Sequence, residues 1–326
     1  MTSTELKKIF NSFKNKRVLI VGDAMIDAYM WGTINRMSPE APVPVVDIEK
    51  YEIRLGGAAN CALNIKALEA EPILCSVVGK DLNGKKFQSL MKGANLPEHG
   101  LVFSNERKTT VKTRVISEGK HQIRIDEEDT HPLQIEDSFL KNTLNLLNDA
   151  NVIILQDYNK GVLTKGIITK LITEAKKRGI PTIVDPKKNN FLEFKNCDIF
   201  KPNLKEIKEG MEIDFDEKID DEIEIATSKL RRALNAKAIL LTLSSDGICI
   251  NSCDSFVRAP AYGGAVVDVS GAGDTVISVA ALLLSEGVSF EDISKISCLS
   301  GGIVCQKVGV VPIEKVELLN KALQII

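Results

Sequence analysis

The chain has 326 residues, of which 44% are hydrophobic and 26% charged, an ordinary balance for a globular protein of one or two domains. A net charge of −2 gives no basic excess for phosphate backbones, so no nucleic-acid partner is expected. The N-terminus lacks an apolar signal core and no apolar run reaches membrane-spanning length. Seven scattered cysteines are typical of reduced thiols. We therefore expect a cytoplasmic protein without a membrane partner.

The first predicted strand is the apolar run Val18–Val21, which ends in Gly22 and Asp23. Continuous apolarity indicates burial on both faces, as in a parallel sheet covered by helices. The turn lacks the G-x-G-x-x-G spacing of dinucleotide-binding folds. Asp23 follows the strand where open α/β sheets bind ligands, so we expect it to accept a hydrogen bond from a sugar hydroxyl. The alternative is that Asp23 only completes a turn.

Two segments interrupt the α/β pattern, at about residues 27–54 and 109–128. The first contains short β-like runs around several prolines, which restrict strands to sheet edges or strand starts. The second alternates by twos around Glu118-Gly119-Lys120, a hairpin pattern. Together they predict a small inserted sheet that covers the main domain as a lid.

Gly56 and Gly57 precede a predicted helix that contains Asn60 and runs to about Leu68. Glycines allow a ligand to approach the backbone closely, and the Asn60 side chain offers both a donor and an acceptor. The alternative is a glycine-rich turn that permits tight helix packing. Downstream, Gly79–Lys86 matches a P-loop except that Lys86 replaces the magnesium-binding Ser or Thr, so we favour an ordinary helix start there.

Beyond residue 150, predicted strands and helices alternate. This rhythm indicates a doubly wound, mainly parallel α/β sheet. Asp157, Asp185 and Asn203 each lie at or just after a predicted strand. Because the carboxyl ends of parallel strands share one sheet edge, we expect these side chains to lie near Asp23.

The most informative segment of the sequence begins with a β-branched run, Val266–Val269. A small-residue turn and an almost entirely apolar predicted helix, Val276–Leu284, follow it. The backbone amides of Gly271, Ala272 and Gly273 can surround an anion at the positive end of that helix.

Asp274 follows directly after this turn. A carboxylate there would repel a bound phosphate, which suggests chemistry rather than binding. We interpret Asp274 as a general base that takes a proton from a hydroxyl attacking phosphorus. The alternative is that Ser270 and Asp274 merely cap the helix.

Two distant stretches, Gly56-Gly57-x-x-Asn60 through Gly79-x-Asp81 and Asp268-x-x-Gly271-Ala272-Gly273-Asp274, resemble the paired signatures of the ribokinase-like (phosphofructokinase-B) carbohydrate kinases. The resemblance covers almost the whole chain, including Pro202-Asn203-x-x-Glu206. It implies an ATP-dependent phosphotransferase with a ribokinase-like fold, a doubly wound sheet plus a small β-sheet lid, in a single domain over residues 1–326.

Other motifs resemble the heptose 7-phosphate kinase domain of ADP-heptose synthesis proteins: Gly22–Asp27, Arg36–Val46, Gln122–Asp126 and Asp157–Gly161. This likeness implies phosphorylation of the anomeric hydroxyl of D-glycero-β-D-manno-heptose 7-phosphate for surface-glycan precursors. Many such proteins carry a following nucleotidyltransferase domain, which we do not expect here because no H-x-G-H motif occurs. The alternatives are another sugar or nucleoside kinase of the family, or a catalytically silent binding protein.

The resemblance and the charge pattern assign expected roles. Asp274 is the expected base, and the Gly271, Ala272 and Gly273 amides the expected phosphoryl cradle. The expected sugar-phosphate contacts are Asp23, Arg36, Gly56, Gly57, Asn60, Arg114, Asp157, Lys160 and Lys187. The expected nucleotide contacts are Asn203, Leu204, Lys205, Glu206, Thr242, Gly247, Asp268 and Cys298.

Glu206 is expected to act on Mg²⁺ through water, and the resemblance leaves open whether a monovalent cation assists. Cys298 stands where the family usually has an asparagine beside the adenine, which puts that contact in doubt. Apolar positions on the lid strands, such as Val43, Val115 and Ile125, would leave an open face in a monomer. We therefore expect a homodimer formed through the lid sheets.

Overall fold

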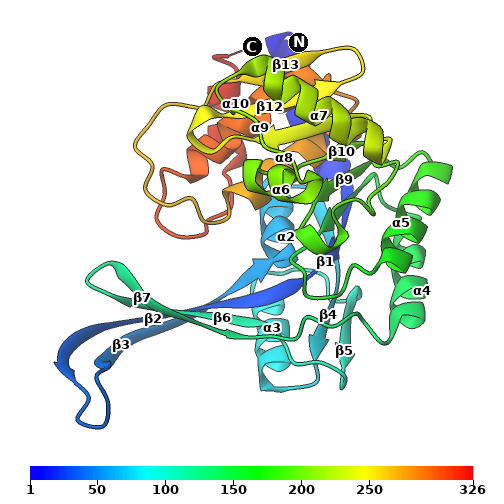
Figure 1. Cartoon of the computed structure of the whole chain (residues 1–326). Helices are drawn as coiled ribbons and strands as arrows, with labels where there is room; N and C mark the ends of the chain where they lie inside the picture. Colours follow the sequence, from blue (N-terminus) through cyan, green and yellow to red (C-terminus); the bar gives the residue numbers. More distant parts are fainter. Residues whose placement is uncertain (326) are drawn as a thin grey trace.

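The computed structural model describes residues 1–325. In this part of the chain the central sheet has nine strands in the order β13-β12-β11-β10-β9-β8-β1-β4-β5 (Figure 1). Neighbouring strands from β5 to β11 pair in parallel, and β12 and β13 continue the sheet antiparallel. The predicted doubly wound, mainly parallel sheet is confirmed.

The strands of the central sheet are short and mostly buried, as their apolar runs predict. They are β1 (Arg17–Gly22), β4 (Glu71–Gly79), β5 (Leu101–Ser104), β8 (Val152–Gln156), β9 (Thr182–Asp185), β10 (Ile199–Phe200), β11 (Ala238–Thr242), β12 (Ile248–Ser252) and β13 (Phe256–Ala259). Alternate residues of β1 enter opposite core layers: Val18 and Ile20 pack on one face of the sheet, Leu19 and Val21 on the other.

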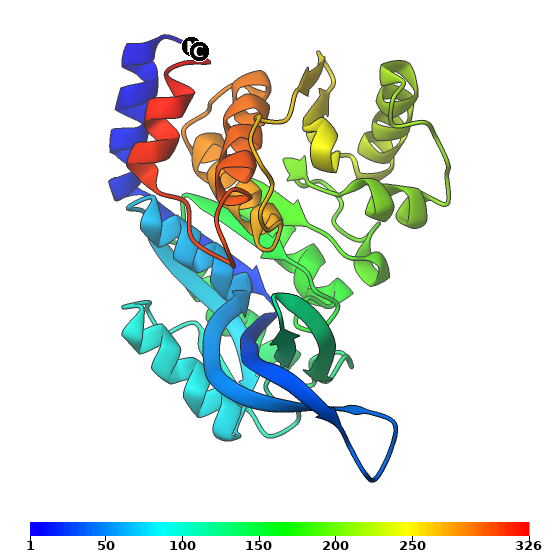
Figure 2. The same ribbon diagram turned by 90° about the vertical axis from the view of Figure 1, so that its left-hand side faces the viewer.

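Helices cover both faces. One layer contains α1 (Ser3–Ser12), α2 (Ala58–Ala67), α3 (Leu82–Gly93), α8 (Ala272–Ser285), α9 (Phe290–Val304) and α10 (Lys315–Ala322), and the other contains α4 (Glu136–Leu147), α5 (Lys165–Lys177), α6 (Leu204–Met211) and α7 (Asp220–Leu234). Short 3₁₀ turns are η1 (Phe13–Asn15), η2 (Lys188–Asn190) and η3 (Ser244–Asp246). The terminal helices α1 and α10 lie side by side (Figure 2). None of the described helices combines the length and apolarity needed to cross a bilayer.

The predicted lid is a separate four-stranded sheet in the order β3-β2-β6-β7. Its strands are β2 (Ala24–Met37), β3 (Pro44–Gly57), β6 (Val111–Ser117) and β7 (Lys120–Glu127). We expected short strands in the first insertion, but β2 and β3 each run for 14 residues. Two register shifts let this ribbon bend without breaking, and it projects from the body of the molecule (Figure 1).

The register of the lid separates two chemically different faces. Asp27 and Tyr29 of β2 lie opposite Lys112 and Arg114 of β6, so these residues share one face, which is charged. The residues between them form the other face, which is apolar except for Thr113 and Glu127. Its apolar residues are Ile26, Ala28, Met30, Tyr51, Ile53, Leu55, Val111, Val115, Ile123 and Ile125.

The structure settles one local expectation and shows the conformation of one further segment. The segment Gly79–Lys86 is a helix start, as favoured: the Asp81 carboxylate accepts from the Gly84 amide at 2.6 Å and caps α3. The β-branched run before the Gly271 turn is not a strand. Val266 and Val269 are 67% and 68% exposed in an irregular loop, and the Val267 and Asp268 amides donate to the Cys305 carbonyl.

Candidate active site

The start of α8 is an open helix N-terminus. Gly271 occupies the N-cap position with φ of 79°, a left-handed conformation that favours glycine. Within the described chain no side chain caps this helix, so the capping interpretation of Ser270 and Asp274 is wrong. The amides of the first turn remain without a side-chain acceptor, as an anion site requires.

Asp274 is buried in that first turn, with 7% exposure. Its Oδ1 accepts hydrogen bonds from the Tyr158 hydroxyl at 2.7 Å and from Gln156 Nε2 at 3.1 Å. Its Oδ2 accepts one from Asn60 Nδ2 at 2.7 Å. Burial raises the pKa of Asp274 to about 6, although the Asn60 and Tyr158 donors oppose this rise. The carboxylate is therefore basic enough to accept a proton near neutral pH.

The partners of Asp274 come from distant parts of the chain. Asn60 lies in the first turn of α2, which packs against α8, whereas Gln156 ends β8 and Tyr158 follows it. The Asn60 Oδ1 atom is buried without a hydrogen-bond partner among the described residues. A buried acceptor beside a basic carboxylate is suited to a hydroxyl-bearing ligand.

Asp23 is almost fully buried at the end of β1. Its carboxylate accepts three hydrogen bonds from main-chain amides, those of Tyr158 at 2.8 Å, Lys160 at 3.0 Å and Val162 at 3.0 Å. Asp23 thus fixes the loop that carries Tyr158. Burial raises its pKa, and its contact with a sugar stays a prediction.

Asp157, in the same loop, accepts from the Asn159 amide and from Asn190 Nδ2. Burial and the neighbouring Asp23 raise the pKa of Asp157 to about 7. Asp157 and Asp23 lie at one edge of the sheet, as predicted, because the Asp23 amide donates to the Gln156 carbonyl at 3.2 Å and the Asp157 amide donates to the Asp185 carbonyl at 3.0 Å.

Asp27 is a candidate residue that our sequence reasoning did not assign. It is 7% exposed at the base of the lid, and its Oδ1 accepts from Arg114 Nη1 at 2.6 Å. A Cβ on Gly56 would lie 2.1 Å from Asp27 Oδ2, and one on Gly57 would lie 2.4 Å from the Asp23 carbonyl oxygen. The glycine pair therefore makes room for the carboxylate. The sequence did contain a sign of this role, because Asp27 ends the Gly22–Asp27 motif that resembles the heptose kinases.

The predicted phosphate-binding cations differ in position. Lys160 Nζ donates to Glu128 Oε1 at 2.7 Å, at the junction of the lid and the strand ends. Lys187 pairs with Glu206, and its ammonium lies 5.8 Å from the centre of the Tyr158 ring. Arg36 is exposed on the projecting part of β2, nine residues beyond Asp27, which is about 30 Å along a strand. The structure does not bring Arg36 to Asp274 within one chain.

The nucleotide candidates form a neighbouring group. Asn203 and Glu206 make a reciprocal capping box at the start of α6: Asn203 Oδ1 accepts from the Glu206 amide at 2.8 Å, and Glu206 Oε2 accepts from the Asn203 amide at 2.9 Å. Leu204 and Lys205 lie in the same turn, and the Lys205 side chain is exposed. Asn203 also forms an isolated parallel β-bridge with Thr242 at the end of β11.

Gly247 and Cys298 both lie against the backbone of Ala259 and Pro260. Gly247 has φ of 91°, and a Cβ there would lie 2.2 Å from the Ala259 carbonyl oxygen. The Cys298 thiol donates to the Pro260 carbonyl at 3.3 Å, and burial raises its pKa to about 11. Cys298 is thus a neutral donor engaged with backbone, and its contact with adenine stays a prediction.

Asp268 joins two loops near α8. Its Oδ1 accepts from the Ser270 amide at 2.9 Å and its Oδ2 from the Gly309 amide at 3.1 Å. No cluster of three or more His, Cys, Asp or Glu side chains suited to a metal occurs among residues 1–325. Glu206 already accepts from the Asn203 amide and pairs with Lys187, so it would reach Mg²⁺ through water, which suits an ion that usually keeps several waters and binds substrate phosphates.

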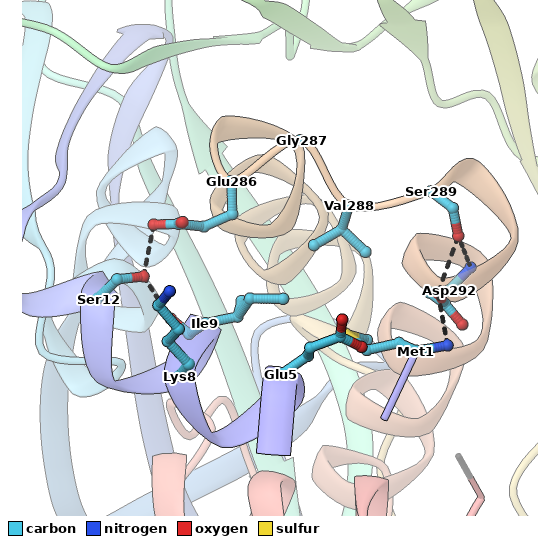
Figure 3. A pocket seen from close by; sticks show the side chains of 10 residues that line it. All are labelled: Met1, Glu5, Lys8, Ile9, Ser12, Glu286, Gly287, Val288, Ser289 and Asp292. Atoms are coloured by element: carbon cyan, nitrogen blue, oxygen red, sulfur yellow. Dashed lines mark hydrogen bonds and ion pairs between the residues drawn. The ribbon is translucent and has the colours of Figure 1, made fainter. Parts of the chain in front are cut away.

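A surface pocket lies between α1 and the turn that joins α8 to α9 (Figure 3). Ser12 Oγ donates to Glu286 Oε1 across one side of it at 2.5 Å. It is at the opposite end of α8 from Asp274 and carries none of the predicted site residues, so it is separate from the candidate active site.

Comparison with known proteins agrees with this geometry. Residues 15–315 match the pfkB family carbohydrate kinases. The chain therefore belongs to the pfkB family, whose members are ATP-dependent phosphotransferases acting on sugars.

Among curated relatives, the chain is 37% identical over 306 residues to the bifunctional protein HldE of Sulfurimonas denitrificans, covering 93% of the chain and 63% of the relative. It is 36% identical over 298 residues to bifunctional protein HldE of Helicobacter pylori strain G27, covering 90% and 64%. The chain thus spans a little under two thirds of the length of these relatives.

Solved structures show the same fold at low identity. Arabidopsis thaliana ribokinase complexed with ribose and ATP superposes with a TM-score of 0.75 at 19% identity, covering 95% of this chain and 99% of that one. Escherichia coli phosphofructokinase-2 in complex with potassium gives a TM-score of 0.78 at 18% identity, covering 95% and 98%. The ribokinase-like fold is confirmed.

Proposed function

We propose that this sugar kinase transfers the γ-phosphoryl group of ATP to the anomeric hydroxyl of D-glycero-β-D-manno-heptose 7-phosphate, giving the 1,7-bisphosphate. The observation that carries the phosphotransfer chemistry is Asp274, a buried carboxylate with a raised pKa at the open N-terminus of α8. The choice of substrate is supported by the similarity to the HldE proteins and by the heptose-kinase-like motifs of the sequence.

The partners of Asp274 suggest which oxygen accepts the proton. Oδ1 already accepts two hydrogen bonds, from Tyr158 and Gln156, whereas Oδ2 accepts one, from Asn60. A carboxylate oxygen accepts about two hydrogen bonds, so Oδ2 has a free position. The sugar hydroxyl donates there, and the unpartnered Asn60 Oδ1 accepts from a neighbouring hydroxyl of the sugar.

In the proposed step, the sugar O–H proton passes to Asp274 Oδ2 as the oxygen forms a bond to the γ-phosphorus. The bond from that phosphorus to the β,γ-bridging oxygen breaks, and its electron pair leaves with ADP. Amides of the Gly271–Gly273 turn hold the phosphoryl oxygens. Magnesium, when bound, neutralises charge on the phosphates, and Glu206 would hold it through water.

The charged face of the lid suits an acceptor that carries its own phosphate. This face carries four cations and two acids from neighbouring strands: Arg54, Lys112, Arg114, Arg124, Asp27 and Asp126. Each of these cations is paired with an acid in the absence of ligand, as in the Arg114–Asp27 pair. A phosphate would compete for them, whereas a neutral sugar would not. Arg114, Lys160 and Lys187 remain the proposed contacts.

We further propose a homodimer through the apolar face of the lid sheet. Tyr51, Ile123 and Ile125 on this face are 51%, 57% and 49% exposed, and a second copy would cover them. The seven cysteines are unpaired, which suits a reducing compartment and supports the expected cytoplasmic location.

The test of the proposed function is an ATP-consumption screen across free sugars, nucleosides and sugar phosphates, with the product identified by ³¹P NMR. We expect turnover of the heptose 7-phosphate, a new anomeric phosphate signal, and at least about 100-fold lower kcat/KM for neutral sugars, because a neutral sugar has no phosphate to pair with the site cations. Comparable turnover of ribose, fructose or a nucleoside would instead identify another kinase of the family. Nucleotide and sugar binding without turnover would indicate a silent binding protein.

A further inference from the structure

Lys201 is a buried cation that the proposed mechanism has not used. It follows β10 directly and is 3% exposed. Its ammonium lies 2.9 Å from Asp185 Oδ2, and Asp185, at the end of β9, is 6% exposed. A buried lysine is costly unless its charge meets a partner, so its position carries information about what it binds.

This pair lies against the turn that begins α8. A Cβ built on Gly273 would come 3.7 Å from Lys201 Nζ and 3.9 Å from Asp185 Oδ2. The ammonium therefore flanks the middle of the turn whose amides form the proposed phosphoryl cradle. An added methyl group at Gly273 would be in van der Waals contact with both charged groups.

The pair is also connected to the base. Gln156 Nε2 donates to Asp185 Oδ2 and to Asp274 Oδ1, both at 3.1 Å. Two carboxylates, one amide and one ammonium thus form a continuous chain. With two negative charges and one positive charge, this chain alone would repel an incoming phosphoryl group, so the position of the ammonium decides whether the group can be held.

The ammonium has capacity for a further acceptor. It carries three N–H donors, and among the described residues Asp185 is its ion-pair partner. Phosphoryl transfer spreads negative charge over the equatorial oxygens of the transferring group. A fixed cation beside those oxygens stabilises that charge without reorganisation.

We propose that Lys201 is a catalytic residue whose ammonium binds the transferring γ-phosphoryl group from the side of Gly273, completing the cradle of backbone amides. Asp185 then acts as a positioning residue that holds Lys201 against the turn. This inference rests on the proposed phosphotransfer at Asp274 but does not depend on which sugar is the acceptor. The competing explanation is that Lys201 only compensates Asp185 and, through Gln156, orients Asp274.

The test compares ligands with and without the γ-phosphoryl group. Calorimetry measures the affinities of ADP and of the non-hydrolysable ATP analogue AMP-PNP for the wild type and for Lys201→Met. We expect the variant to bind AMP-PNP about 10- to 100-fold more weakly, because a charged hydrogen bond is lost, while the affinity for ADP changes less than about twofold. Lys201→Arg, which keeps the charge, should retain part of the preference.

A second variant tests whether misfolding, rather than loss of the phosphoryl contact, explains the weaker binding. Lys201→Met leaves Asp185 buried and unpaired, whereas Lys201→Met with Asp185→Asn removes both charges and leaves a neutral amide beside Gln156. The double variant should keep its melting temperature and still lack the preference for AMP-PNP. If the preference returns in the double variant, Lys201 only compensates Asp185 and the inference is wrong.

The matched control is Lys16→Met. Lys16 pairs with Glu286 at 3.0 Å at the far end of α8, so its loss should leave both nucleotide affinities unchanged. Equal weakening of ADP and AMP-PNP in Lys201→Met would contradict the inference. A wild type that binds ADP and AMP-PNP equally well would also contradict it. A wild type that prefers AMP-PNP but phosphorylates no heptose would overturn only the proposed substrate.

Discussion

The chemistry of single residues centres on the balance of forces at Asp274. Burial disfavours its charge, whereas donors from Tyr158, Gln156 and Asn60 stabilise it. The result is a pKa of about 6, high enough for a useful base and low enough for the base to be ionised at neutral pH. A carboxylate with only one of these influences would be either too weak a base or largely protonated.

Asp274→Asn should abolish proton acceptance and preserve the fold. General-base catalysis contributes about 10²–10⁴-fold, so turnover should fall at least about 100-fold. The new side-chain NH₂ group would face the NH₂ group of Asn60. Because Asn60 Oδ1 has no partner, a flip of the Asn60 side-chain amide lets that oxygen accept a hydrogen bond from the new group. ATP binding should persist or tighten slightly because a negative charge near the phosphate is lost. Turnover, ATP affinity and melting temperature measured on one preparation check this, and near-normal turnover in a stable variant would remove the catalytic assignment.

The raised pKa of Asp274 predicts two opposite pH dependences. Activity needs the ionised base, so kcat/KM should fall as pH decreases through about 6. The free energy of unfolding has the opposite pH dependence. Because the folded-state pKa rises from 3.8 to about 6, the Asp274 contribution is fully present below about pH 4 and is lost as pH rises through 6, an effect of about 3 kcal/mol. The difference in the free energy of unfolding between the wild type and Asp274→Asn, measured by urea denaturation from pH 4 to 8, isolates this contribution.

Tyr158→Phe removes one donor to Asp274 without changing the shape of the side chain. The hydroxyl lowers the pKa of Asp274, so its loss should move the acidic limb of the kcat/KM profile to higher pH. At pH 8, turnover should fall about 10- to 100-fold, because one hydrogen bond to a charged group is worth about 1.5–3 kcal/mol. An unchanged acidic limb would mean that Tyr158 does not hold the base in the working enzyme.

At the scale of elements, the start of α2 shows how a glycine pair builds a site. The end of β3 passes so close to β2 that Asp27 occupies the space of a Gly56 side chain. This close approach is a property of two paired strands, and it fixes where the lid meets the large sheet.

Gly56→Ala should therefore displace Asp27 and disturb its ion pair with Arg114. We expect the KM for the sugar to rise at least about 10-fold, with little change in the KM for ATP, and a stability cost of about 1–3 kcal/mol from overpacking. Gly93→Ala is the matched control, because nothing lies within 4 Å of a Cβ there and alanine suits the end of α3. Equal kinetics in both variants would remove Gly56 and Asp27 from the sugar site.

At the scale of the whole molecule, the lid separates two surfaces. Its charged face lies toward the strand ends, as the ion pairs of Glu128 with Lys112 and Lys160 show. Its apolar face continues past the part covered by the main domain, and the outer residues Ile123 and Ile125 are about half exposed. A long, apolar and exposed sheet surface is one that soluble proteins tend to bury.

Light scattering at micromolar concentration should therefore give a dimer for the wild type. Ile123→Glu should shift the protein to a monomer, since a charge in the centre of an apolar interface is left without a partner. Ile225→Glu on α7 is the control, because Ile225 is 56% exposed, as Ile123 is, but lies away from the lid. A monomeric wild type, or equal effects of the two variants, would rule out the proposed interface.

Local features of the sequence by themselves determined much of this protein. Apolar runs such as Val18–Val21 predict buried parallel strands, because no other environment accepts a segment that is apolar on both faces. The almost entirely apolar segment Val276–Leu284 predicts a buried helix, and the small residues Gly271–Gly273 before it predict an anion site at its N-terminus. These features depend on neighbouring residues, so they can be read without the fold, and family resemblance supplied the expected chemistry.

Only the tertiary structure decided which side chains meet. Asn60, Gln156 and Tyr158 contact Asp274 across more than 100 residues of chain. Lys201, which follows β10, lies beside Gly273 in the first turn of α8. Such contacts depend on strand register and helix packing, and a shift of one residue in a strand would turn each side chain to the opposite face. For the same reason, the two faces of the lid and the exposure of Arg36 emerged only when β2 was paired with β3 and β6.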